Sequence, residues 1–363
     1  MKTTETFRPD WALPPGVTII ALLRERQLSI EEFASKIEQS IEDVQALLQG
    51  RSTITLALAR RLSAVLGASI EFWMARDYRY RDTIARLQSA EEKWLSELPL
   101  KDMVKYGWLN ARPSEEVGAC LRFFGVPSVA AWRASYESLL SATAFRTSKA
   151  FESKPGAVAA WLRAGELEAA TIDCNPWDAD RFRESLSKIR PLTRQKDPER
   201  FIPKLKAQCA ENGVAVVIVR APDGCRASGA TRFITVQKAI LQLSFRFRSD
   251  DQFWFTFFHE VGHLLLHGHG RLFLEGIGTP PTAQEEEASA FAARTLIPVD
   301  EEKALLKLRP SHQSVLRFAT RLGIAPGIIV GQLQHHGLRK DYLNDLKRRF
   351  EWEEYTSITR GKT

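Results

Sequence analysis

Two histidines and a glutamate stand at a spacing that favours metal chemistry: His259, Glu260 and His263, within the run Phe257-Phe-His-Glu-Val-Gly-His263. On a helix that rises about 1.5 Å per residue, the two histidines are one turn and about 6 Å apart, so both imidazoles can reach one ion. Glu260 projects beside that ion, where its carboxylate can take a proton from a bound water. The pattern predicts a zinc site that activates water for hydrolysis at neutral pH.

A catalytic zinc needs a third protein ligand and one open position. His267 stands about 12 Å along the helix axis from His259, which is too far for metal bonds of about 2 Å. A downstream acidic residue is the remaining choice, and we expect it to be Glu285. The positions that share a helical face with Glu285 are small: Ala288, Ser289 and Ala292. They would let this helix press against the histidine helix, and Ser289 could then support a metal ligand.

The acidic run Glu285-Glu-Glu287 leaves alternatives open. Glu286 or Glu287 could replace Glu285 as the ligand. An acidic first turn is also what a helix dipole favours without any metal. A purely structural reading of the histidine helix is harder to sustain, because burying three polar side chains without partners costs several kcal/mol.

These residues resemble the ImmA/IrrE family of zinc metallopeptidase-like domains over roughly residues 200–300. The resemblance rests on Phe255-Thr-Phe-Phe-His-Glu-Val-Gly-His263, on Leu266-His-Gly268, and on the block from Glu285 to Pro298. In that family the last block usually has Asn or Asp at the position of Ser289. The resemblance implies a gluzincin-like core with Zn2+ as cofactor. It also implies a protein substrate of the repressor type, held by strand addition to a sheet edge beside the metal.

The elements that must position this site are a small sheet and many helices. Short apolar runs predict strands at 214–219, 233–236 and 239–244, and we expect the last of these to be the edge strand that holds the peptide. Residues 195–200 are expected to form a linker, and the pattern elsewhere is helical. The predicted fold class is therefore mainly α with a small β-sheet (α+β).

A pair of short helices is predicted near the N-terminus. Ser29 is suited to cap the first, and Glu32 three residues later completes a capping box. Ser40 is suited to cap the second, which ends before Gly50. Two short helices joined by three or four residues form a helix-turn-helix, whose second helix can enter a DNA major groove.

Residues 13–82 resemble the helix-turn-helix domain of HigA-like antitoxins and XRE-type (phage-repressor-type) regulators. The resemblance rests on Pro15-Gly16, Leu28 to Ala34, Gly50 to Ile54 and Leu66 to Trp73. It implies DNA binding and transcription regulation. The contacts expected with duplex DNA would come from five polar residues: Ser40, Gln45, Gln49, Arg51 and Ser52.

The same segment departs from the pattern where DNA would lie. Glu38 stands in place of the turn glycine, and Glu42 and Asp43 put carboxylates at the start of the second helix. Carboxylates there would face a polyanion, although they can accept a hydrogen bond from cytosine. A helical module for dimerisation or partner docking, without DNA binding, is the alternative.

The chain has 363 residues, which is too long for one compact core. We expect a helix-turn-helix domain at 1–82, a helical middle region at 83–195, the zinc metallopeptidase domain at 196–300 and a C-terminal helical region at 301–363.

The net charge is +7, but residues 1–80 hold ten basic and ten acidic residues. Bulk basicity therefore does not argue for DNA binding at the N-terminus. The basic run Lys347-Arg-Arg349 is expected to be a solvated face.

Four cysteines without a C-x-x-C pair fit free thiols in a reducing compartment. No apolar run approaches the roughly 18 to 20 residues that a helix needs to cross a bilayer. The first thirty residues show no secretory signal pattern. We therefore expect a cytoplasmic protein without a membrane partner, and we count a homodimer among its expected states.

These patterns together predict a transcriptional regulator coupled to a zinc-dependent endopeptidase, a hydrolase that cleaves a protein substrate. One alternative is a DNA-binding antitoxin or repressor whose zinc domain is a non-cleaving sensor or partner-binding module. A third reading is a peptidase effector whose N-terminal module binds protein only. Salt-dependent affinity for duplex DNA separates the last from the others, because phosphate contacts impose a steep salt slope.

Overall fold

A computed structural model describes residues 11–144, 153–268, 272–275, 283–337 and 341–351. The chain divides into two compact units. The first unit comprises Met1–Ser96 with Val126–Ala134, and the second comprises Glu97–Gly125 with Ser135–Thr363. The fold is mainly helical with one four-stranded mixed sheet, which confirms the predicted α+β class.

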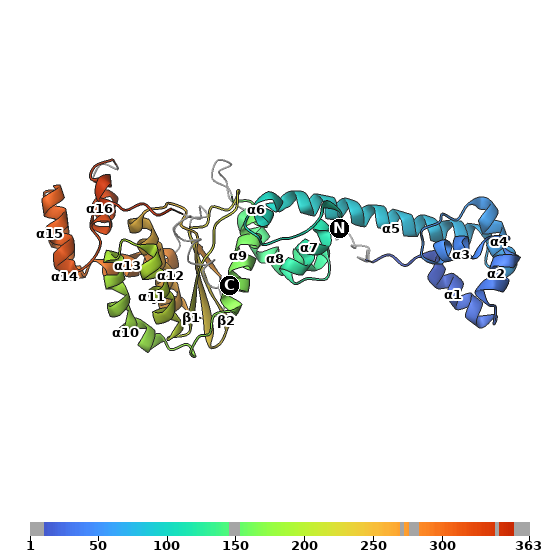
Figure 1. The fold of residues 1–363 in the computed structure, drawn as a ribbon, viewed down its shortest axis with the longest axis horizontal. Helices are drawn as coiled ribbons and strands as arrows, with labels where there is room; N and C mark the ends of the chain where they lie inside the picture. The colour runs from blue at the N-terminus through green and yellow to red at the C-terminus, as the bar shows by residue number, and fades with distance from the viewer. Residues whose placement is uncertain (1–10, 145–152, 269–271, 276–282, 338–340, 352–363) are drawn as a thin grey trace, which may run out of the picture. The chain divides into compact units, whose positions relative to one another are not determined.

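The first unit is helical. Its main elements are α1 (Pro15–Glu25), α2 (Ile30–Lys36), α3 (Ile41–Leu48), α4 (Leu56–Leu66) and α5 (Ile70–Glu97). Helices α1 to α4 gather around the start of α5 (Figure 1). Their shared core includes Phe33, Val44 and Trp73, which are fully buried. Burial of these apolar faces stabilises helices that would be too short to persist alone.

The predicted caps of α2 and α3 are confirmed. Ser29 accepts a hydrogen bond from the backbone N–H of Glu32, and the Glu32 side chain accepts one from the backbone N–H of Ser29. Ser40 accepts from the backbone N–H of Asp43. Between the helices, Glu38 has φ of +51°, the left-handed conformation that glycine adopts at least cost. Arg61 stabilises this turn with an ion pair to Glu38, at 2.8 Å.

The second unit is built around the sheet, whose strands are β1 (Val214–Ile218), β2 (Gly229–Thr235), β3 (Lys238–Leu243) and β4 (Phe273–Glu275). Their order is β1-β3-β2-β4. β1 runs parallel to β3, with Val214 opposite Ala239, while β2 is antiparallel to both of its neighbours. The strand that we expected at the edge is therefore interior: β3 is paired along both sides, and the end of the sheet beside β2 is β4.

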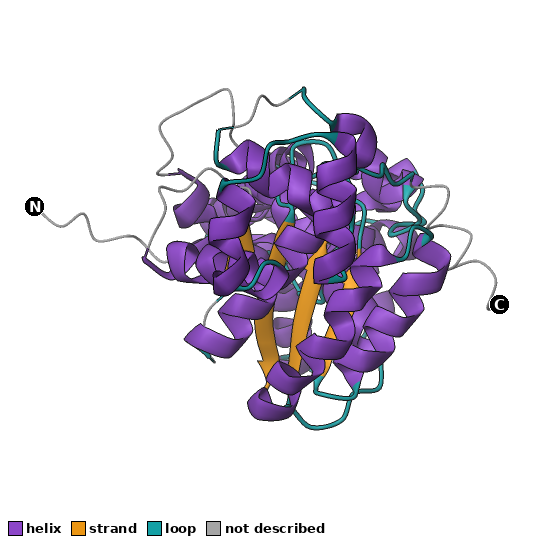
Figure 2. Ribbon diagram, turned by 90° about the vertical axis from the view of Figure 1, so that its left-hand side faces the viewer, coloured by secondary structure: helices purple, strands orange, loops and turns teal. Residues whose placement is uncertain are grey.

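Helices cover both faces of this sheet (Figure 2). On one face, Val216 and Leu241 join an apolar core with α10 (Ala179–Ile189), α11 (Pro198–Ala210) and α12 (Asp250–His267). On the other face lies α9 (Pro155–Ala170), where Gln242 of β3 donates a hydrogen bond to the backbone carbonyl of Trp161, at 2.7 Å. Buried residues on both faces explain why the strands read as continuous apolar runs rather than as alternating ones.

The remaining helices complete the second unit. They are α6 (Leu100–Lys105), α7 (Glu116–Phe124), α8 (Val129–Ala144, whose first six residues belong to the first unit), α13 (Ala283–Leu296), α14 (Val299–Leu306), α15 (His312–Leu322) and α16 (Pro326–His335), with short 3-10 turns at Pro113–Glu115, Arg190–Arg194 and Asn344–Leu346. The predicted linker at 195–200 is only partly correct. Asp197 caps α11 by accepting from the backbone N–H of Glu199, so Pro198 already begins a helix.

The segment that follows α16 packs back onto the start of α12. Phe350 is buried, and Ser249 pairs with Arg349 as an isolated antiparallel bridge. Lys347 forms an ion pair with the buried Asp251, at 2.7 Å, and only 14% of its own side chain is exposed. The expectation of a solvated basic run is therefore wrong for Lys347, because a buried carboxylate requires a cation.

Within the described ranges, no single helix has both the length and the apolar character to cross a bilayer. The pair α15 and α16 reaches that composition only when taken together, and the two helices are bent by 110° at their junction.

Candidate metal centre

The histidine pair lies on the buried face of α12. His259, Glu260 and His263 are 2%, 0% and 1% exposed. The residues around them on the same helix are large and apolar, including Phe257 and Phe258, so α12 is held in the core of the second unit. Because the two histidines are four residues apart, their side chains lie on the same side of the helix, with ring centroids 4.7 Å apart.

Helix α13 packs closely against α12 through small residues. Ala288 and Ala292 are fully buried. A Cβ added to Gly262 of α12 would lie 3.1 Å from the Cα of Ala288, so the two backbones approach as closely as a glycine permits. This close packing brings Glu285, one turn before Ala288, to the histidines.

Three ligand atoms converge in this space. The Nε2 atoms of His259 and His263 are 3.0 Å apart, and Oε2 of Glu285 lies 3.0 Å from Nε2 of His259. Oε1 of Glu285 is 3.6 Å from Nε2 of His263. The group can hold a metal ion, since one atom from each residue lies within 4.8 Å of the others. Two imidazoles and a carboxylate, about 2 Å each from a common centre, are a donor set that zinc accepts.

The pKa shifts of Glu285 and His263 favour the protonation states in which these two side chains bind a metal. Burial alone would raise the pKa of Glu285, but hydrogen bonds and charge interactions with the two histidines outweigh it and hold that pKa at about 2. Burial lowers the pKa of His263, against the opposing effect of Glu285. A charged carboxylate and neutral imidazoles are the forms in which these side chains bind a metal.

Glu260 lies beside the ligands and against the start of β2. A Cβ added to Gly229 would lie 2.5 Å from Oε1 of Glu260, so the absence of a side chain at Gly229 makes room for the carboxylate. Of the two alternative acidic ligands, Glu287 instead contacts His267, at 3.0 Å. Glu286 is exposed and lines a separate surface pocket with Leu266.

Contacts behind the histidine rings complete the centre. Oγ of Ser289 lies 3.2 Å from Nδ1 of His259. Ser289 is therefore within hydrogen-bond distance of the ligand that we expected it to support. Nδ1 of His263 lies 3.0 Å from Nδ1 of His267, a contact that the sequence analysis missed. The spacing could have indicated it, because His267 is four residues after His263. The ring of Phe273 in β4 stacks on the ring of His263, with centroids 4.0 Å apart.

The residues expected to contact DNA belong to the first unit, whereas the metal centre belongs to the second. Ser40 caps α3, and its hydroxyl also donates to Oδ2 of Asp43, at 2.8 Å. Gln45, Gln49 and Arg51 are exposed, on α3 or just after it, and Ser52 is partly buried. Glu42 and Asp43 are exposed in the first turn of the same helix.

Two histidines and a glutamate on adjoining helices, with a second glutamate following the first histidine, define a centre of the metallopeptidase type. Residues 214–333 match the Peptidase_M78 family, described as the IrrE N-terminal-like domain. The match extends from β1 to α16 and includes all four of these residues. None of the curated proteins compared with this sequence matches it.

Proposed function

We propose that this protein is a zinc-dependent endopeptidase that hydrolyses a peptide bond in a protein substrate. The observation that carries the proposal is the convergence of His259, His263 and Glu285, with Glu260 buried beside them. Zinc bound there would act as a Lewis acid toward the peptide carbonyl and would lower the pKa of the attacking water.

The protein's own residues supply positioning and proton transfer. His259, His263 and Glu285 would hold the ion, and Ser289 would orient the His259 ring. Glu260 would accept the proton of the attacking water and deliver it to the amine that leaves when the peptide bond breaks. Close packing around Gly229 and Thr256 limits the positions open to the Glu260 carboxylate, which would keep it at the reacting atoms.

An extended peptide could bind along β4. This strand lies at the end of the sheet, and its Phe273 contacts His263 of the centre. Peptides commonly add to such an edge through backbone hydrogen bonds. β4 therefore replaces residues 239–244 in the substrate-binding role that we first expected of them.

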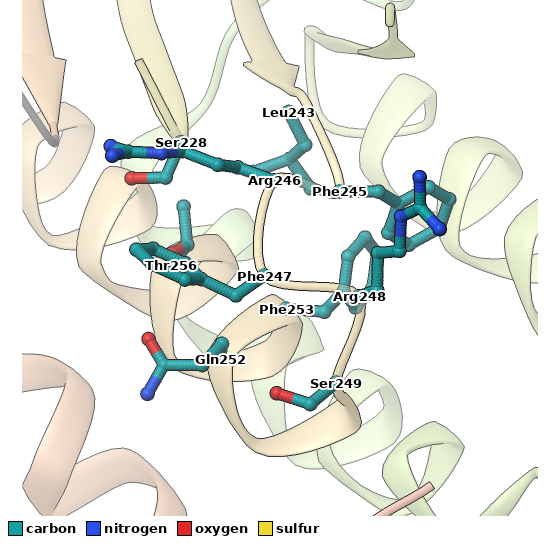
Figure 3. Close-up of a pocket in the computed structure, with 10 residues that line it drawn as sticks. All are labelled: Ser228, Leu243, Phe245, Arg246, Phe247, Arg248, Ser249, Gln252, Phe253 and Thr256. Atoms are coloured by element: carbon teal, nitrogen blue, oxygen red, sulfur yellow. The ribbon is translucent and has the colours of Figure 1, made fainter. Parts of the chain in front are cut away.

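A cavity beside α12, near the centre, could receive substrate side chains. The cavity has a volume of about 470 Å³ and is lined by Phe255 and Ser289, with α13 and α16 forming further walls. A second pocket, with a volume of about 10 Å³ and so room for about one water, lies under the loop from β3 to α12. Figure 3 shows Arg246 and Phe247 of that loop on the same side as Thr256, one turn before Glu260.

The test is cleavage of candidate repressor proteins by the wild type and by Glu260→Gln. We expect the variant to bind zinc and to lose activity by about 10²- to 10⁴-fold, since a general base contributes this much. Removing the metal with a chelator should abolish cleavage, and added zinc should restore it. Equal cleavage by both proteins would exclude Glu260 as the base.

We further propose that the first unit binds duplex DNA, which would couple proteolysis to transcription control in a cytoplasmic, homodimeric regulator. The short α2 and α3 and the exposed Gln45, Gln49 and Arg51 support this. Binding should weaken steeply with salt, and Arg51→Ala should reduce the salt slope. Affinity that does not change with salt would favour a protein-docking role. Operator binding by a wild type that cleaves nothing would favour the non-cleaving sensor.

A further inference from the structure

A row of three polar side chains, His263, His267 and Glu287, extends from the metal centre along α12 and α13. Nδ1 of His263 lies 3.0 Å from Nδ1 of His267, and Nε2 of His267 lies 3.0 Å from Oε2 of Glu287. The side chain of His267 is only 5% exposed, while 62% of the Glu287 side chain is exposed. The row therefore connects a buried ligand to a carboxylate at the surface.

The number of hydrogens on each ring determines which atom donates and which accepts in each hydrogen bond of this row. A carboxylate only accepts hydrogen bonds, so Nε2 of His267 must carry the hydrogen that it donates to Glu287. When His267 is neutral, its imidazole has only this one N–H, so its Nδ1 is left as an acceptor. The contact between the two Nδ1 atoms is then a hydrogen bond only if Nδ1 of His263 donates. The lone pair of neutral His263 is thereby placed on Nε2, the atom that faces His259 and Glu285.

The contact behind the ring of His259 does not fix its tautomer in the same way. Its Nδ1 lies 3.2 Å from the hydroxyl of Ser289, and a hydroxyl can either donate or accept. Ser289 can therefore orient the His259 ring without deciding which nitrogen carries the hydrogen. His267 also touches the ring of Phe273, with centroids 5.4 Å apart. That packing requires a ring at position 267, but it does not require an acceptor there.

We propose that His267 and Glu287 are positioning residues that fix the tautomer of His263 and so strengthen metal binding. This inference rests on the proposed function only in that the centre binds a metal, and it does not require proteolysis. Partners of this kind, behind a metal ligand, typically contribute about 10- to 100-fold to metal affinity.

The test compares zinc affinity, by competition with a chelator, in full-length variants that retain the wild-type melting temperature. His267→Phe keeps a ring against Phe273 but has no acceptor, so zinc affinity should fall by about 10- to 100-fold. His267→Gln offers an amide oxygen to Nδ1 of His263 and should recover most of the loss. Glu287→Ala removes the acceptor for Nε2 of His267 and should weaken binding, and Glu286→Ala is the matched control, which should not. If His267→Phe does not fold, the comparison of zinc affinity between Glu287→Ala and Glu286→Ala decides.

The second readout is the tautomer of His263 in the metal-free protein, from ¹⁵N shifts of labelled histidine assigned with His263→Gln. We expect the Nδ1–H form in the wild type and a mixture in His267→Phe. Unchanged zinc affinity in His267→Phe would overturn the proposal. If the wild type binds no zinc, the proposed function fails, and the tautomer alone decides: the same tautomer in both proteins would then overturn the positioning role.

Discussion

Replacing Gly229 with alanine should impair Glu260 without removing any metal ligand. A Cβ at this position would lie 2.5 Å from Oε1 of Glu260 and 2.7 Å from Cγ2 of Thr256. Ordinary contacts between such atoms are about 3.5 Å, so the Glu260 carboxylate must move by about 1 Å. A displacement of this size at a reacting group costs about 100-fold in rate, or about 2.7 kcal/mol of activation free energy.

The assay is kcat/KM on a repressor-type substrate that the wild type cleaves, measured beside zinc affinity. We expect kcat/KM to fall by about 100-fold while zinc affinity changes little, because the ligands are untouched. The matched control is Gly118→Ala in α7, where a Cβ would meet the flexible tip of Arg122 at 3.3 Å. Wild-type activity in a folded, zinc-loaded Gly229→Ala protein would show that the position of Glu260 does not set the rate.

Three further predictions concern stability. Burial, together with the charge of Asp251, raises the pKa of Asp250 from 3.8 to about 7, so the folded state keeps a proton that the unfolded state releases. The free energy of unfolding should therefore fall by up to about 4 kcal/mol as the pH rises from about 4 to 7, and urea titrations should show that Asp250→Asn escapes this fall. Lys347→Met leaves Asp251 buried without its cation and should cost about 3 to 5 kcal/mol; an unchanged urea midpoint would contradict the ion pair. Glu38→Gly should be more stable than Glu38→Ala by about 1 kcal/mol, because only glycine adopts φ of +51° without strain, and equal melting temperatures would count against that reasoning.

The sequence indicates which three side chains converge, because their positions depend on helical spacing. His259 and His263 come together because four residues make about one turn. Glu285 reaches them because the small side chains on its face let α13 approach α12. These relations lie within one helix or between two helices with plainly matched faces, so pattern alone could predict them.

What the sequence did not predict depends on pairing between distant segments. β4 has three residues, too few to show an alternating pattern, so the edge role was assigned to β3. β2 begins at Gly229, four residues before the predicted strand, because Gly229 and Ala230 are buried by neighbours and not by their own apolar bulk. The ion pair between Lys347 and Asp251 joins the segment after α16 to the start of α12, and no local pattern in the sequence marks it.

The burial of Phe350 has a consequence for how much chain the metal centre requires. Its ring packs against Phe201, Phe245 and Phe253, with centroids 5.7, 5.5 and 5.9 Å away. Phe201 precedes the matched family segment, and Phe350 follows it. A fragment trimmed to 214–333 would lose α9 from one face of the sheet and α10 and α11 from the other, and it would expose this aromatic cluster to water. The shortest piece that we expect to fold independently with its histidines in place runs from the start of α9 to Phe350.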